Sequence, residues 1–74
     1  MTKDIVFEYF INDIRERLRE IYPKLREYLQ QNSPVLLPLY EHYYQQAMYH
    51  PNPIVASEYA YRIFRAYVNL KTKT

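Results

Sequence analysis

The sequence predicts an all-α fold, a small bundle of three to four helices whose first helix is long and is either kinked or broken at Pro23. Three observations support this fold class. Apolar residues repeat in alternating steps of four and three through the first 31 residues, as on one face of a helix. The chain has no glycine, which the tight turns of β-hairpins favour. Ser33–Pro34 and Asn52–Pro53 each pair an N-cap residue with proline at the first helical position.

The apolar stripe of the first helix, here called the seam, is the strongest pattern in the chain. It consists of Phe7, Ile11, Ile14, Leu18, Ile21, Leu25 and Tyr28. A repeat of this kind is typical of coiled coils. A domain of 74 residues without cysteine has a small core and no disulfide to stabilise it. We therefore expect the seam to be a self-association surface, and the protein to form a homodimer.

The first two turns of this helix are apolar on nearly every side, so Ile5, Val6 and Phe10 need a second surface, from this chain or from another copy.

Farther along, the charged residues of this helix are sorted onto two flanks. One outer flank holds Asp13, Glu16, Glu20 and Glu27, and the other holds Asn12, Arg15, Arg19, Tyr22 and Arg26. Each arginine has an acid within helical reach, which favours a solvated face over a phosphate-binding stripe.

Pro23 leaves two alternatives for residues 3–31. The helix ends at Tyr22 and Pro23 opens a second helix, or one helix continues with a kink. The seam keeps its register across Pro23, which favours the kink. Twenty-eight helical residues measure about 42 Å, whereas a compact chain of this length is only about 30 Å across. An unbroken helix would overhang a monomer and so implies a partner.

Two further helices complete the single domain, residues 1–74. One spans 34–49, with either a lead-in turn at Pro34–Leu37 or a start at Leu37–Pro38. The last spans 53–70, and residues 71–74 form a frayed tail. The expected buried stripe of the last helix is Ala56, Tyr59, Ala60, Ile63, Ala66, Tyr67 and Leu70.

Catalysis, metal binding and cofactor binding find no support in the sequence. Without glycine there is no phosphate-binding loop of the nucleotide-binding folds. Without cysteine there is no thiolate ligand, and His42 and His50 lack a partner set for zinc. Neither serine has a base oriented by a third group within reach. We expect no catalytic residues, no metal, no cofactor and no enzymatic activity.

Tyrosine is abundant, at ten residues, and is common at protein interfaces because it is large, rigid and amphipathic. Tyr40, Tyr43 and Tyr44 span too wide an arc of the helix for one small neighbour to bury. Together with Tyr49 they are the candidate surface for another protein. The predicted function is a small non-enzymatic protein-interaction or assembly module, acting through the seam and this tyrosine-rich surface.

An alternative function is a dimeric regulator that binds nucleic acid. Residues 52–74 carry four basic residues and one acid, Glu58. The candidate phosphate contacts are Arg62, Arg65, Lys71 and Lys73, with Arg15, Arg19 and Arg26 as further contributors. The last helix does not suit the recognition helix of a helix-turn-helix motif. It begins with apolar residues, at the positions where side chains that read bases usually lie.

The chain is expected to be soluble and cytoplasmic, with no membrane partner. Asp4 and Glu8 interrupt the apolar run at the start of the chain, which does not resemble a signal peptide. No apolar run approaches the roughly 18 residues of a membrane span. A composition free of glycine and cysteine and rich in tyrosine also suggests an origin in a thermophile or its virus.

Overall fold

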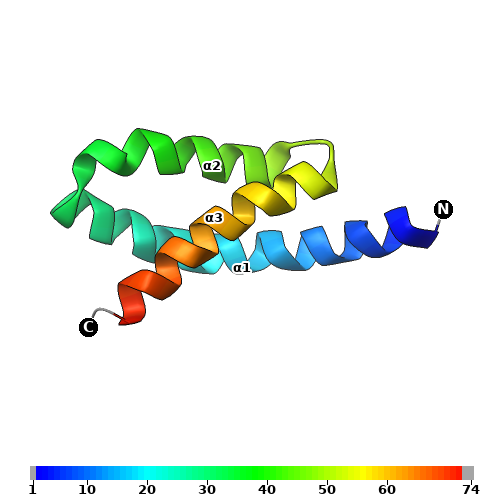
Figure 1. Ribbon diagram of the computed structural model, residues 1–74, viewed down its shortest axis with the longest axis horizontal. Coiled ribbons are helices and arrows are strands. Elements are labelled where there is room, and N and C mark those ends of the chain that lie inside the picture. Colours follow the sequence, from blue (N-terminus) through cyan, green and yellow to red (C-terminus); the bar gives the residue numbers. More distant parts are fainter. Residues whose placement is uncertain (1, 73–74) are drawn as a thin grey trace.

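The computed structural model describes residues 2–72, with side chains from residue 9 onward. It contains α1 (Thr2–Asn32), a 3-10 turn η1 (Pro34–Leu36), α2 (Leu37–Tyr49) and α3 (Pro53–Thr72). No strand occurs in this part of the chain. The prediction of an all-α bundle with a long first helix is therefore confirmed (Figure 1).

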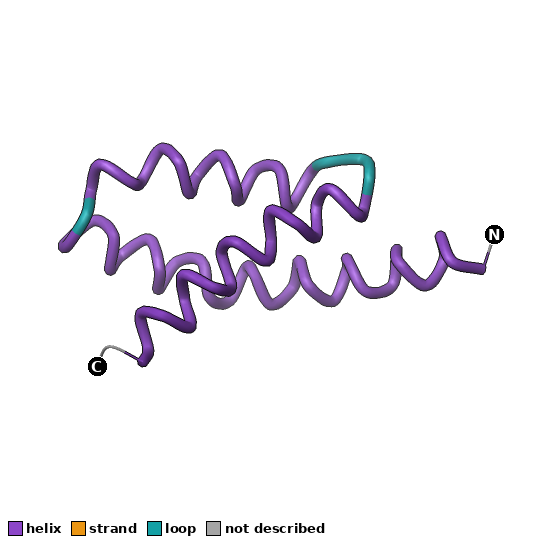
Figure 2. Tube along the Cα trace, in the orientation of Figure 1, coloured by secondary structure: helices purple, strands orange, loops and turns teal. Residues whose placement is uncertain are grey.

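α1 and α2 lie side by side and antiparallel, and α3 crosses both on one face (Figure 1). All three pairs of helices are in contact. The two connections lie at opposite ends of the bundle (Figure 2). The start of α1 runs past the turn between α2 and α3, so the molecule is elongated, at 44 × 22 × 15 Å. Its Cα radius of gyration, 13.0 Å, exceeds the roughly 11 Å of a compact domain of this length.

α1 continues through Pro23, so the alternative of a helix broken after Tyr22 is wrong. Pro23 and Arg19 are both exposed, so the carbonyl of Arg19, left without its usual N–H donor, lies on the solvent side of α1. On either side of the proline, Leu18 and Leu25 are fully buried in the same core. The packing of this face therefore holds the helix together across its weakest position.

The core lies where α1, α2 and α3 meet, and Leu18, Leu25 and Ile63 are its largest fully buried side chains. Ala47 and Ala60 are also fully buried, and their small side chains allow the helices to approach closely. The expected stripe of α3 lies at this junction. Of its members Ala56, Ala60 and Ile63 are buried, and Tyr59, Ala66, Tyr67 and Leu70 are partly buried.

The seam faces the other helices of its own chain. Ile11, Leu18 and Leu25 are buried, and Ile14, Ile21 and Tyr28 are partly buried against the core. The side chain of Phe7 lies outside the described residues. A second copy therefore cannot reach the central seam residues unless α2 and α3 move away.

The flank of α1 expected to face solvent with Arg15, Tyr22 and Arg26 is instead the side against which α2 packs. Tyr22 is buried, and its ring stacks on that of Tyr44 with centroids 4.1 Å apart. Arg26 forms an ion pair with Glu41 of α2 at 3.4 Å. The expectation was wrong for Tyr22 and Arg15, which contact α2, whereas Asn12, Arg19 and Arg26 of the same flank are exposed. On the other flank, Asp13 forms an ion pair at 3.9 Å with Arg17, four residues farther along the same helix.

The two proline-containing connections differ. Asn52 caps α3, since its Oδ1 accepts a hydrogen bond from the N–H of Ile54 at 2.9 Å. The side chain of Ser33 makes no capping bond; its carbonyl accepts from Leu36 N–H at 2.9 Å, and the single turn η1 leads into α2. At the other end, α3 includes Lys71 and Thr72, which were expected in a frayed tail.

Candidate functional site

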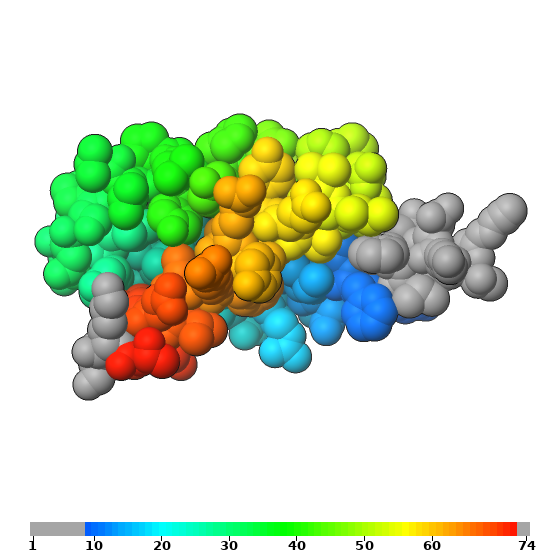
Figure 3. Space-filling model, viewed as in Figure 1, coloured from blue at the N-terminus to red at the C-terminus, as the bar shows by residue number. Residues whose placement is uncertain are grey.

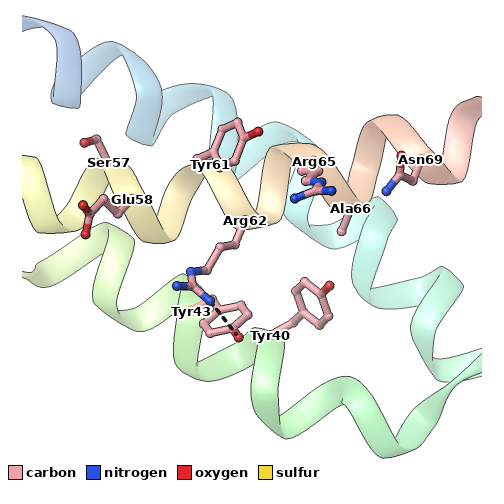
Figure 4. A pocket seen from close by; sticks show the side chains of 9 residues that line it. All are labelled: Tyr40, Tyr43, Ser57, Glu58, Tyr61, Arg62, Arg65, Ala66 and Asn69. Carbon is pink, nitrogen blue, oxygen red and sulfur yellow. Dashed lines mark hydrogen bonds between the residues drawn. The ribbon is translucent and has the colours of Figure 1, made fainter.

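An open groove of about 920 Å³ lies between α2 and α3 (Figure 4). We call it the α2–α3 groove. It is lined by Tyr40, Tyr43, Ser57, Glu58, Tyr61, Arg62, Arg65, Ala66 and Asn69. Most of these side chains are polar, and both signs of charge are present with arginine in excess.

One wall of the groove is the outer face of α3. Ser57, Tyr61, Arg65 and Asn69 are spaced four residues apart, so they follow one another along this face (Figure 4). Tyr61 is 63% exposed, and Arg65 is exposed as well. Among the described residues Arg65 forms no hydrogen bond or ion pair. Its guanidinium is therefore available to a ligand.

Arg62 is held between the two helices. Its guanidinium carbon lies 5.3 Å from the ring centroid of Tyr43 and 5.9 Å from that of Tyr59. Its Nη1 donates a long hydrogen bond of 3.5 Å to the hydroxyl of Tyr43 (Figure 4). The rings of Tyr43 and Tyr59 themselves lie 5.8 Å apart. These contacts fix the guanidinium at the rim of the groove.

The predicted nucleic-acid residues are only partly brought together. Arg62 and Arg65 share the α2–α3 groove. Lys71 is not among the lining residues, and its Nζ lies 5.1 Å from the ring centroid of Tyr67. Lys73 is outside the described residues. Arg15, a further candidate, donates from Nε to the carbonyl of Ala47 at 2.8 Å and from Nη2 to that of His50 at 3.0 Å.

The tyrosines expected to form one partner surface lie in three places. Tyr40 and Tyr43 line the α2–α3 groove, with their rings edge to face at 5.4 Å. Tyr44 packs on Tyr22. Tyr49 is 72% exposed at the end of α2. Tyr61 and Asn69, which the sequence interleaves with Arg62 and Arg65, also line the groove, whereas the sequence does not place these residues against α2.

A second candidate surface lies at the N-terminal end of the bundle. Tyr9 and Phe10, the first described side chains of α1, are 76% and 60% exposed. Tyr49 and Ile54, on either side of the α2–α3 turn, are exposed at the same end. We call these four residues the N-terminal patch. The described part of α1 at this end, in blue, reaches the surface beside the yellow start of α3 (Figure 3).

The described residues provide no cluster of metal-ligating side chains. No group of three or more His, Cys, Asp or Glu side chains within residues 9–72 converges on a metal position. His42 packs edge to face on Tyr59 at 5.8 Å, and the Nδ1 of His50 accepts a hydrogen bond from the N–H of Asn52. Within the described chain no helix is apolar over the length that a bilayer crossing needs.

Among the described residues, Tyr22 is the titratable residue whose pKa is clearly perturbed. Burial raises the pKa of its hydroxyl above the ordinary value of 10.0, and the negative charge of Glu41 raises it further. The hydroxyl oxygen is buried and has no hydrogen-bond partner among the described residues. An unpaired buried hydroxyl of this kind lowers the stability of the folded chain.

The chain matches no protein-family model, and no curated protein or solved structure compared with it is significantly similar. The function is therefore argued from the residues described above.

Proposed function

We propose that the protein is a small non-enzymatic assembly module that forms a homodimer through the N-terminal patch. The observation that carries this proposal is the exposure of Tyr9 and Phe10 on a helix that runs past the rest of the bundle. Large exposed aromatic side chains gathered at one end favour a protein interface over a solvated surface.

The partner that we propose is a second copy of this chain. A 74-residue domain without disulfides has little core of its own, so association is a usual source of additional stability. The sequence requires Phe10 to meet a second surface, and its own chain leaves it mostly uncovered. Two α1 ends related by a two-fold axis would cover each other.

The size of such an interface is a further constraint. A stable interface buries about 800 Å² on each partner, which is about one seventh of the 5616 Å² surface of this chain. Tyr9 and Phe10 alone do not supply that area. Tyr49 and Ile54 at the same end extend the apolar surface toward it.

The test is the mass of the protein in solution at micromolar concentration, by analytical ultracentrifugation. We expect a dimer for the wild type and a monomer for Phe10→Glu, because two buried carboxylates would face each other across the two-fold axis. Val35→Glu is the matched control, since Val35 is 83% exposed at the opposite end of the bundle. It should remain dimeric.

A monomeric wild type, or a Phe10→Glu variant as dimeric as the wild type, would overturn the proposal. Leu18→Asp is not a suitable probe even though Leu18 belongs to the seam. Its side chain is fully buried within the chain, so the substitution would unfold the protein whatever its oligomeric state.

A further inference from the structure

We propose that the α2–α3 groove binds single-stranded nucleic acid, with arginines on the phosphates and tyrosine rings under the bases. This inference concerns a different surface from the N-terminal patch and does not depend on self-association. It rests on which side chains the two helices bring together in one open recess (Figure 4).

The phosphate contacts come from Arg62 and Arg65. The rings of Tyr43 and Tyr59 hold the guanidinium of Arg62 in place before any ligand arrives. Less conformational entropy is then lost when it binds a phosphate. Arg65 lies one helical turn along α3, is exposed, and has no hydrogen bond or ion pair among the described residues. Two such guanidiniums in one groove favour a chain of phosphates.

The stacking surfaces come from both walls. Tyr61 on α3 has a ring that is 63% exposed, and Tyr40 on α2 lies half-buried edge to face with Tyr43. Aromatic rings beside a positively charged groove are the usual means of binding single strands, because every base has a face that can stack. Asn69 and Ser57 add polar groups along the same wall.

The shape and lining of the α2–α3 groove favour single-stranded nucleic acid over a duplex or a protein. A duplex keeps its bases stacked inside, so the tyrosine rings of a recess have nothing to stack on. The buried core of a protein interface is more apolar than the rest of the surface, whereas Ala66 is the one aliphatic side chain among the residues that line this groove. Glu58 repels phosphate, so we place the strand toward Arg65 and Asn69.

The experiment measures binding by fluorescence anisotropy with labelled oligo-dT and oligo-U of about 12 nucleotides, within the range of known site sizes. A duplex of the same length is the comparison. We expect the wild type to bind at least one single strand more tightly than the duplex at about 50 mM salt. Two phosphate contacts predict a slope of log affinity against log salt of about −1.4.

Variants locate the site. Arg65→Gln should halve the salt slope, to about −0.7. Tyr61→Ala should weaken binding at least about five-fold, the lower end of the effect of removing a stacking ring. Arg19→Gln removes the same charge from an exposed position on α1 outside the groove, and it should bind as the wild type does.

Circular dichroism and thermal unfolding of each variant separate a binding defect from a folding defect. Tyr61 and Arg65 are exposed, so both variants should fold as the wild type does. Three results would overturn the proposal. They are the absence of single-strand binding at about 50 mM salt, tighter binding of the duplex, and wild-type affinity in both Arg65→Gln and Tyr61→Ala.

Discussion

Tyr22 of α1 and Tyr44 of α2 stack face to face, with ring centroids 4.1 Å apart and ring planes 11° from parallel. This pair joins two antiparallel helices beside the core formed by Leu18 and Leu25. The stack buries the ring of Tyr22 and, with it, a hydroxyl that has no partner in the described chain. The aromatic contact is stabilising, whereas the buried hydroxyl opposes it.

Tyr22→Phe should therefore stabilise the protein. The substitution keeps the stacked ring and removes an unsatisfied polar group, which predicts a free energy of unfolding higher by about 1 kcal/mol. Chemical denaturation measures it. Tyr61→Phe is the control, because the ring of Tyr61 is exposed, and it should change stability by less than about 0.5 kcal/mol. If Tyr22→Phe destabilised the protein, the hydroxyl would have a partner in solution.

The same variant should also change the response to alkaline pH. The folded pKa of Tyr22 is raised, so its neutral form is favoured in the native state, and its contribution to stability is complete below about pH 10. As the pH rises above that value, the unfolded state loses the proton first and stability falls. Wild type should lose stability above about pH 10 more steeply than Tyr22→Phe, because phenylalanine does not titrate.

The length and core-facing side of α1 could be predicted because helical periodicity is local. Residues spaced by three and four lie on one face whatever covers them, and Leu18 and Leu25 are buried as that rule requires. Periodicity does not say whether the cover comes from the same chain or from a second copy. The seam was expected to associate with another copy, and α2 and α3 of its own chain occupy it.

The candidate site was predictable in part for the same reason. Arg62 and Arg65 belong to one exposed face of the last helix, which follows from their spacing. That Tyr40 and Tyr43 complete a groove with them depends on how α2 and α3 pack against each other. The sequence also placed Tyr22 and Arg15 toward solvent, because the angle around a helix identifies a side without identifying the neighbour on that side.

Arg15 of α1 is a residue whose environment depends on the neighbouring helix α2. It reaches from α1 to the end of α2, where its guanidinium donates to the carbonyls of Ala47 and His50. Carbonyls in the last turn of a helix lack helical donors, and a cation there also interacts favourably with the helix dipole. Arg15 therefore fastens the C-terminal end of α2 to α1.

Arg15→Met should lower the free energy of unfolding by about 1.5 kcal/mol, the lower end for hydrogen bonds to a charged group, because the site is only partly buried. Urea denaturation measures the loss. Arg15→Lys should recover only part of it, since an ammonium does not present the planar fork that reaches both carbonyls. Arg19→Met, at an exposed position of α1, should be close to neutral. Equal losses in Arg15→Met and Arg19→Met would contradict this account.

Pro23→Ala tests the cost of the proline within α1. Alanine restores an N–H donor for the exposed carbonyl of Arg19 and removes the steric clash with it. The gain is reduced by about 0.4–1 kcal/mol, because the unfolded chain becomes more flexible without proline. Proline inside a helix costs about 3 kcal/mol, so we expect a net rise in the free energy of unfolding of about 2 kcal/mol, measured by thermal and urea unfolding.

The opposite result would also be informative. A loss of stability in Pro23→Ala would mean that a bend imposed by the proline is needed to seat Leu18 and Leu25 in the same core. Pro34→Ala is a suitable comparison. Pro34 opens the turn η1 rather than standing inside a helix, so it interrupts no helical hydrogen bond. That variant should not be stabilised.

Asn52 and Ser33 occupy equivalent places in the sequence, each directly before a proline, but only Asn52 caps through its side chain. Its Oδ1 accepts from the N–H of Ile54 at 2.9 Å, whereas the Ser33 side chain makes no capping bond to η1. Asn52→Ala should therefore lower the free energy of unfolding by about 1 kcal/mol, and Ser33→Ala by less than about 0.3 kcal/mol. Urea denaturation of the two variants side by side measures the difference. From the sequence alone, an N-cap residue directly before a proline predicts the same effect at both positions. Equal losses would therefore contradict the difference in capping that the structure shows.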